Sequence, residues 1–264
     1  NLPLNFNYRT SLYEHYGNAL NVNPAQKRFG TMANGIGDAR LTASYWVLDP
    51  LKHMKGNFSV GLGLKLPTGD SKAMDKFHRR ASDGSDYTIE KPVDQSIQLG
   101  DGGVGINLEI QGYQQLFSRT SLYYNGFYMS NPRNVNDAAN VAPDKVVTDE
   151  MVRYMSVADQ YAGRVGLNYA LAPKAGIGAT LGARIEGVPA YDLIGGSDGF
   201  RRPGYIFSIE PGISYSTAKN TFFVSVPVAT QRNRIKSASD WVNNKHGDAA
   251  FADYFISATV THRF

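Results

Sequence analysis

Apolar and polar residues alternate with a period of two through most of this 264-residue chain, and the alternation constrains the fold more than any other feature. From Phe58 to Leu66, every second residue is Phe, Val or Leu, and serine, glycine and lysine lie between them. The same alternation runs through 101–113 and 176–188. Successive side chains of a β-strand point to opposite faces, so this period predicts an all-β protein.

The alternating segments also predict how the strands are connected. About ten strands are expected, near residues 2–11, 36–48, 57–67, 101–113, 119–130, 155–171, 176–188, 205–215, 220–230 and 251–264. The connections between them alternate in length, with short ones at 49–56, 114–118, 172–175 and 216–219, and long ones at 12–35, 68–100, 131–154, 189–204 and 231–250. Short turns at one end and long loops at the other are typical of outer-membrane barrels. We therefore predict one domain, residues 1–264, that forms a closed antiparallel transmembrane β-barrel with short periplasmic turns and long extracellular loops.

The composition of the two strand faces indicates which face meets water. The polar face consists of Gly, Ser, Thr, Asn and Gln with few charges, whereas the outer face of a soluble barrel or sandwich would carry more Lys and Glu. Aromatic residues gather at strand ends, beside the short turns (Tyr45, Trp46, Phe58, Phe117, Tyr169, Tyr215, Phe222) and towards the long loops (Tyr8, Tyr128, Tyr161, Tyr205, Tyr254). Two aromatic girdles around an aliphatic band are typical of lipid–water interfaces. The apolar face is therefore expected to contact the lipid bilayer of the bacterial outer membrane, and a soluble barrel is the alternative.

Several classes of site have no signature in the sequence. The chain has no cysteine, which excludes disulfides and cysteine-based metal or nucleophile chemistry. Its net charge of +4 is not gathered into a block of like charges, so no nucleic-acid partner is expected. Neither a Gly-x-Ser-x-Gly motif nor a phosphate-binding loop is present. We therefore expect no enzyme activity, no cofactor and no metal site.

The last predicted strand ends at Phe264. A terminal strand that ends in Phe resembles the signal by which outer-membrane barrels are recognised, so the barrel-assembly machinery is an expected partner. Lipopolysaccharide is a second expected partner, because Arg79 and Arg80 in the 68–100 loop could meet its phosphates.

Two motifs indicate a family. Residues 35–50 contain a Gly-x-Gly-Asp strand start, formed by Gly35, Gly37 and Asp38, and the next strand ends in Leu-Pro-Thr-Gly-Asp, from Leu66 to Asp70. The chain thereby resembles the outer-membrane channel family of meta-pathway phenol-degradation transporters. The resemblance implies a channel for passive uptake of small hydrophobic or aromatic molecules. Members of that family have about twelve strands, so twelve is the alternative to ten.

Charged residues on the polar face are the candidate lumen or constriction residues. Alternation points six of them inward: Lys65, Glu109, Arg164, Arg184, Glu186 and Glu210. Arg164 and Arg184 lie on strands joined by the 172–175 turn, so they should be close across the ladder and need a nearby carboxylate or anion. Either a charged constriction that filters solutes or an ion-pair network that braces a narrow lumen would fit.

Two prolines within predicted strands are candidates for a lateral kink. Pro211 and Pro227 lie at similar depth on strands joined by the 216–219 turn. Because proline cannot donate to a ladder, the pair predicts either a kink that opens an exit towards lipid or a pair of bulges.

Two other functions remain open on the sequence. An outer-membrane hydrolase or protease would need an extracellular Asp/His site, for which His15, His78 and His246 with nearby aspartates are available. A closed structural barrel that anchors a partner protein is the other alternative. The sequence does not define the oligomeric state or the transported molecule.

Overall fold

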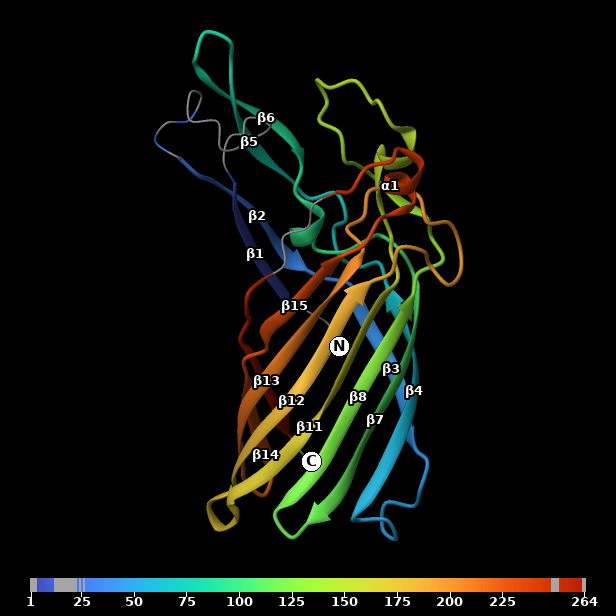
Figure 1. Cartoon of the computed structure of the whole chain (residues 1–264), viewed down its shortest axis with the longest axis vertical. Coiled ribbons are helices and arrows are strands. Elements are labelled where there is room, and N and C mark those ends of the chain that lie inside the picture. The colour runs from blue at the N-terminus through green and yellow to red at the C-terminus, as the bar shows by residue number, and fades with distance from the viewer. Residues whose placement is uncertain (1–3, 12–22, 24, 26, 248–251, 263–264) are drawn as a thin grey trace.

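Long tilted strands form most of the molecule (Figure 1). The computed structural model describes residues 4–11, 23, 25, 27–247 and 252–262, and for 4–11 it describes the backbone alone. The main sheet contains ten strands: β3 (Ala39–Trp46), β4 (Gly56–Leu66), β7 (Gly105–Phe117), β8 (Thr120–Ser130), β11 (Gln160–Ala172), β12 (Ile177–Val188), β13 (Gly204–Ser216), β14 (Asn220–Ser225), β15 (Val228–Arg234) and β16 (Ser257–His262).

These ten strands occupy nine positions in one curled antiparallel sheet. Their order is β16-β14-β13-β12-β11-β8-β7-β4-β3, and β15 follows β14 along the same edge of β13. The sheet forms a half-barrel, with β3 and β16 at its two edges. The short turns predicted between neighbouring strands all lie at one end, the lower end in Figure 1.

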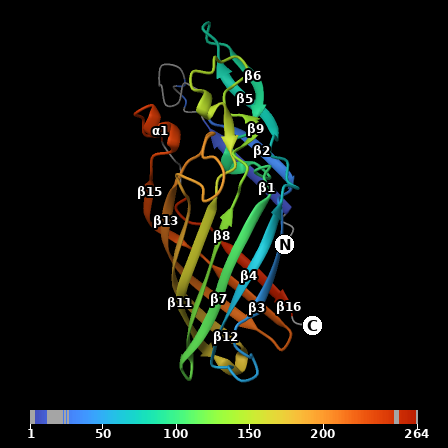
Figure 2. The same ribbon diagram turned by 90° about the vertical axis from the view of Figure 1, so that its right-hand side faces the viewer.

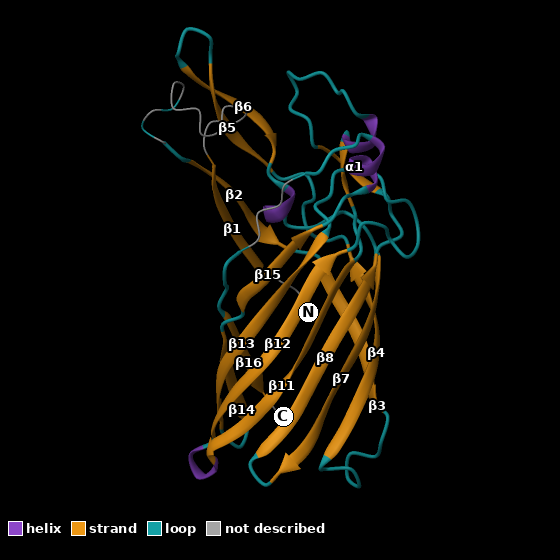
Figure 3. Ribbon diagram, in the orientation of Figure 1, coloured by secondary structure: helices purple, strands orange, loops and turns teal. Residues whose placement is uncertain are grey.

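The long connections at the upper end carry their own secondary structure (Figures 1, 2 and 3). Three two-stranded sheets form there, from β1 (Leu4–Ser11) with β2 (Phe29–Ile36), β5 (Met74–Arg80) with β6 (Asp86–Pro92), and β9 (Val135–Ala139) with β10 (Tyr154–Ser156). Short helices lie in the same region, namely η1 (Gln95–Ile97), η2 (Glu150–Val152) and α1 (Ala238–Val242), while η3 (Pro173–Ala175) is in a lower turn. None of the described helices is long and apolar enough to cross a membrane.

The predicted strand at 2–11 is wrongly placed by the sequence pattern. Its described part, β1, pairs with β2 from Leu4 opposite Ile36 to Ser11 opposite Phe29, so it lies outside the main sheet and 12–35 is not all loop. The reason is local packing, because Ala33 of β2 joins Val93, Ile97 and Leu99 in a buried apolar cluster. That cluster holds β2 above the main sheet, and β2 offers β1 a partner there.

Three other predicted strands differ in extent. The segment 155–171 divides into β10 and β11, the segment 220–230 is interrupted before β15, and the last strand is described from Ser257. The prediction of about ten consecutive barrel strands is therefore corrected to nine positions in the main sheet.

The two faces of the main sheet have the reverse of the usual polarity. Along β4, Ser59 and Lys65 are each 2% exposed, whereas Leu62 is 61% exposed. Leu108 on β7 and Val165 on β11 continue the exposed apolar face. The predicted separation into a polar and an apolar face is confirmed, and the polar face is the enclosed one. A soluble barrel with an apolar interior would show the opposite pattern.

Exposed rings gather at the lower end of this apolar face, whereas the predicted upper group is mostly half-buried, at Tyr128, Tyr161 and Tyr205. Exposed aromatic side chains beside the lower turns are Tyr45, Phe117, Tyr169, Tyr215 and Phe222, and Tyr254 lies exposed towards the upper end. Trp46 was expected on the apolar face but lies on the polar one, because it pairs with Ser59, which is buried there. The centroid of its ring is 6.0 Å from that of Tyr113. The side chain of Tyr8 lies outside the description.

Candidate functional site on the polar face of the sheet

The six candidate charges all lie on the polar face, but they fall into separate groups. Arg164 lies directly opposite Arg184 in the β11–β12 ladder, which confirms the predicted neighbours. Each arginine has its own carboxylate, Glu210 for Arg164 and Glu186 for Arg184. The two guanidiniums are thereby neutralised separately, and no single ring of charge forms among the six.

Glu210 is the most enclosed of these carboxylates. It is 1% exposed, and its Oε1 accepts hydrogen bonds from Ser225 Oγ at 2.7 Å and from Arg164 at 3.3 Å. Its Oε2 is buried without a hydrogen-bond partner among the described residues. A buried carboxylate with one unsatisfied oxygen is costly, and the ion pair with Arg164 offsets part of that cost.

Two glycines beside Glu210 make room for the side chain of Tyr123. A Cβ on Gly182 would lie 2.4 Å from the Tyr123 hydroxyl, and one on Gly166 would lie 2.7 Å from it. The small residues thus allow Tyr123 to reach across the polar face at this level and narrow it.

Arg184 has an aromatic neighbour from the last part of the chain. Its guanidinium lies over the Phe255 ring, 4.9 Å from the ring centroid. Its partner Glu186 is two residues further along the same strand, so the pair is local to β12. Such a stack holds a flat cation in place while leaving its edge free to donate hydrogen bonds.

Lys65 belongs to a third group, at the upper end of β4. Its ammonium binds Asp101 and lies 3.9 Å from Asp38, and the lysine is almost fully buried. Asp38 also accepts hydrogen bonds from the backbone N–H groups of Gly69 and Asp101, at 3.0 and 3.1 Å. Burial raises the pKa of Asp38 despite these hydrogen bonds and Lys65.

The two motifs that indicated a family meet in this group. The Thr68 hydroxyl donates to the Gly37 carbonyl at 2.8 Å and accepts from the Ala39 N–H at 2.8 Å. The Gly-x-Gly-Asp and Leu-Pro-Thr-Gly-Asp segments therefore form one hydrogen-bonded junction between the main sheet and its upper loops. Their role in this structure is to fix where β3 begins and where β4 ends.

Glu109 lines a cavity of about 210 Å³ at mid-height on the polar face. Its Oε1 accepts from the amide of Asn107 and from the Thr42 hydroxyl, and no ion pair to Glu109 occurs within the described ranges. The cavity, called the chamber below, is lined by Ser44, Ser59, Gly61, Glu109, Ile110, Gln111, Asn125, Gly126 and Arg164.

The two candidate prolines lie at a break between strands. β14 ends at Ser225 and β15 begins at Val228, so Pro227 occupies the interruption, while Pro211 stays within β13. Hydrogen bonds span the break, because the Val226 N–H donates to the Pro211 carbonyl at 3.0 Å and the Phe255 N–H donates to the Pro227 carbonyl at 3.4 Å. Pro227 is fully buried. The prolines thus mark an irregularity that neighbouring backbone covers.

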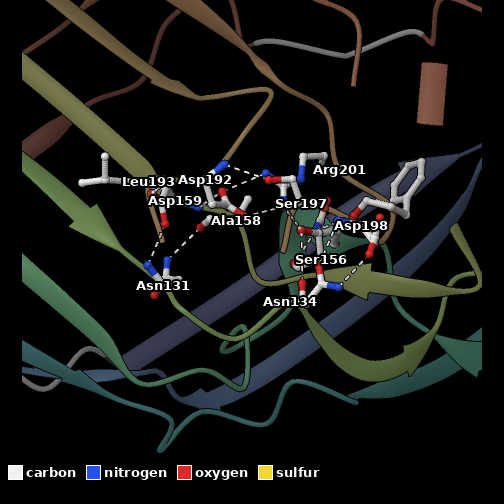
Figure 4. Close-up of polar contacts among 12 residues, drawn as sticks. Asn131, Asn134, Ser156, Ala158, Asp159, Asp192, Leu193, Ser197, Asp198 and Arg201 are labelled. Carbon is white, nitrogen blue, oxygen red and sulfur yellow. Dashed lines mark hydrogen bonds and ion pairs between the residues drawn. The ribbon is translucent and has the colours of Figure 1, made fainter. Parts of the chain in front are cut away.

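A network of buried polar groups, missed by the sequence pattern, locks the upper loops together (Figure 4). Asp159 is fully buried and accepts from Tyr128 Oη at 2.8 Å, the Asn131 N–H at 2.6 Å and the Leu193 N–H at 2.8 Å. The ion pair of Arg201 with Asp192, at 2.6 Å, is equally buried. We call the segments 93–104, 131–160 and 189–203 the outer cap.

Arg202 and Asp94 form a second clasp within the outer cap. Two guanidinium nitrogens of Arg202 each donate to one Asp94 oxygen at 2.9 Å. Burial alone would raise the pKa of Asp94, but the Arg202 guanidinium and the Ser96 hydrogen bonds together hold it well below its ordinary value. The clasp is therefore charged at all physiological pH values.

The depressed pKa of Asp94 sets how the clasp responds to acid. A carboxylate with a lowered folded-state pKa stabilises the fold above its unfolded pKa, 3.8 here, and loses that contribution as pH falls further. Hydrogen exchange of 93–97, corrected for its intrinsic pH dependence, should therefore stay constant from about pH 7 to 5 and rise only below about pH 4. Arg202→Gln should remove this acid dependence. Faster exchange of 93–97 in the wild-type protein already near pH 6 would contradict this expectation.

The histidines and arginines of the outer loops have mixed placements. His78 Nδ1 lies 3.0 Å from Asp86 in the β5–β6 hairpin, with both side chains about one-third exposed, and His246 contacts the Gly247 carbonyl.

Arg79, one of the two arginines expected to meet lipopolysaccharide phosphates, is buried and forms an ion pair with Asp144. Its guanidinium therefore does not face the surface. No cluster of three potential metal ligands occurs among the described residues. His15 and Phe264 lie outside the described residues.

No protein-family model and no curated protein matches this chain. The resemblance to meta-pathway phenol-degradation transporters therefore stays a prediction. The fold and the site define the chain as an all-β protein, built on a curled antiparallel sheet with an enclosed polar face and an exposed apolar face.

Proposed function

We propose that this protein is an outer-membrane channel for passive uptake of small molecules, with its apolar face in lipid and its polar face lining the lumen. The observation that carries the proposal is the reversed polarity of the main sheet. Leu62 and Leu108, which pair across β4 and β7, and Val165 on β11 are about half exposed or more. Exposed apolar residues recur at every second position along each of these three strands. Water would not favour so continuous an apolar surface, whereas hydrocarbon would.

We also propose that the sheet closes into a barrel of ten positions. An antiparallel sheet of nine positions has edge strands that run in the same direction, so β3 and β16 cannot pair antiparallel with each other. One further strand, antiparallel to both, would satisfy the two edges, and closure would remove the exposed edge hydrogen-bonding groups that lipid does not tolerate. β1 is antiparallel to β2, which continues into β3 after only Gly37 and Asp38, so a strand in line with β1 has the required direction.

The outer cap suggests how the lumen is controlled. Its three segments are bound to one another at the upper end of the sheet, for example through Gln95, whose amide donates to the Ser156 and Phe200 carbonyls at 3.1 Å. In the proposed orientation the cap lies on the extracellular side. We propose that solutes pass this cap before they reach the ion pairs of Arg164 and Arg184.

Planar-bilayer recording tests the channel. Purified, refolded protein, checked as heat-modifiable on electrophoresis, should give discrete openings. Arg164→Ala should move the reversal potential in a KCl gradient towards cation selectivity, because it removes a lumen guanidinium and leaves Glu210 in place. Arg153→Ala is the matched control, because Arg153 lies in the outer loops beside Glu150, and it should leave the reversal potential unchanged.

Two outcomes would contradict this proposal. A folded protein without openings or solute flux would favour a structural barrel that anchors a partner. Equal reversal potentials for Arg164→Ala and Arg153→Ala would place Arg164 away from the ion path.

A further inference from the structure

The chamber beside Glu109 and Arg164 offers groups of opposite charge to a small ligand. Its lining side chains are hydroxyls, amides, one carboxylate and one guanidinium, with Ile110 as the apolar exception. Such a surface has little to offer an aromatic hydrocarbon, because polar groups left facing an apolar molecule lose their water without replacement. The chemistry of the wall therefore indicates a polar solute.

Three groups on the chamber wall have spare hydrogen-bonding capacity. Arg164 uses Nε for Asn125, at 3.0 Å, and Nη1 for Glu210, which leaves Nη2 without an acceptor in the described part of the chain. Glu109 accepts from the Thr42 hydroxyl and the Asn107 amide through Oε1, which leaves Oε2 without a donor in the described part of the chain. A ligand with a cationic and an anionic end could engage both.

Ser59 supplies an independent observation at the same place. It is 2% exposed, it lines the chamber, and its Oγ is buried with no hydrogen-bond partner among the described residues. Buried hydroxyls are normally paired, so an unpaired one that lines a cavity points to an occupant.

We propose that the chamber is a binding site for a small zwitterion of the amino-acid type, whose ammonium binds Glu109 and whose carboxylate binds Arg164. Ser59 then donates to, or accepts from, the bound solute. This inference rests on the proposed function, because it names the class of solute that the lumen would select. It differs from the hydrophobic or aromatic cargo that the sequence resemblance implies.

Trp46 provides a reporter for this site. It lies opposite Ser59 in the β3–β4 ladder, and the chain has one other tryptophan, Trp241, in α1. In full-length Trp241→Phe protein folded in detergent micelles, titration with L-alanine should change Trp46 fluorescence saturably. Glycerol, a neutral polyol, and cyclohexanol, an apolar alcohol, should produce no saturable change.

Variants test the assignment of groups. Glu109→Gln should weaken L-alanine binding about tenfold or more, the usual effect of losing one charged hydrogen bond. Ser59→Ala should weaken it about two- to fivefold with little risk to folding, because it removes a hydroxyl that has no partner in the protein. Glu90→Gln, an exposed carboxylate of the β5–β6 hairpin, is the matched control and should bind as the parent does.

The outcomes separate this inference from the proposed function. L-alanine binding that Glu109→Gln and Ser59→Ala leave unchanged, or saturation by cyclohexanol alone, would overturn the inference while channel openings could persist. Saturable L-alanine binding that both variants weaken would support it, even if bilayer recording gave no openings and overturned the channel.

Discussion

Val165→Arg should weaken folding into lipid vesicles by about 2–4 kcal/mol, the cost of a cation facing the middle of a bilayer. Val165 is 48% exposed on β11, a strand near the middle of the sheet. Tyr161 and Tyr169 lie four residues to either side on the same face, so Val165 is at the centre of the proposed aliphatic band. Denaturant titration of the refolded protein in phosphatidylcholine vesicles measures the effect.

Val146→Arg is the matched control for this experiment. Val146 is 85% exposed in the upper loops, where an arginine would meet water, so its substitution should change stability by about 0.5 kcal/mol or less. In a water-soluble protein both valines are surface residues, and both substitutions would be nearly neutral. Equal effects of the two variants would therefore refute the proposed lipid-facing orientation.

The faces of individual strands could be predicted from the sequence, because the period of two fixes them residue by residue. Lys65 and Glu210 are buried on the polar face as expected, and Arg164 lies opposite Arg184 because the 172–175 turn sets the register of its two strands. These features depend on neighbouring residues and on short turns, so they are encoded locally.

Strand partners across long connections could not be predicted in this way. The segment 4–11 alternates well enough for a barrel strand, but alternation does not say whether its partner is 39–46 or 29–36. The choice depends on the buried cluster of Ala33 with Val93, Ile97 and Leu99, which unites segments about 60 residues apart. Similarly, 155–171 reads as one strand, although Asp159 turns towards the outer cap and separates β10 from β11.

The outer cap was missed for the same reason. The donors to Asp159 come from segments about 30 residues away in sequence, and the Arg201–Asp192 pair lies within one loop that otherwise reads as solvated. The available signal was an aspartate directly after two apolar residues, Val157 and Ala158, inside a segment that alternates like a strand. A charge in such a strand is costly to bury unless several donors surround it, so it marks a candidate junction.

Asp159→Ala should release the outer cap and produce the largest change in channel behaviour. Tyr128, Asn131 and Leu193 would each lose the same buried acceptor. The hydrogen bond to Asn131 is buried and the other two are partly buried, so at about 1 kcal/mol per donor the cap should lose about 3 kcal/mol of local stability. The 189–203 segment should then be cut by protease in folded protein. In the proposed channel, single-channel conductance should also rise, because the upper end of the sheet would no longer be covered.

Asp198→Ala is the control for Asp159→Ala, because it also removes one carboxylate from the outer cap, but an exposed one. Asp198 is exposed and accepts from the Asn134 amide at 2.9 Å, so water can replace it and the cap should stay closed. If Asp159→Ala raises protease cutting but not conductance, the cap is structured by Asp159 without limiting the lumen, and the narrow level at Tyr123, Arg164 and Glu210 must limit flow instead. If neither variant changes protease cutting, Asp159 does not hold the loops together.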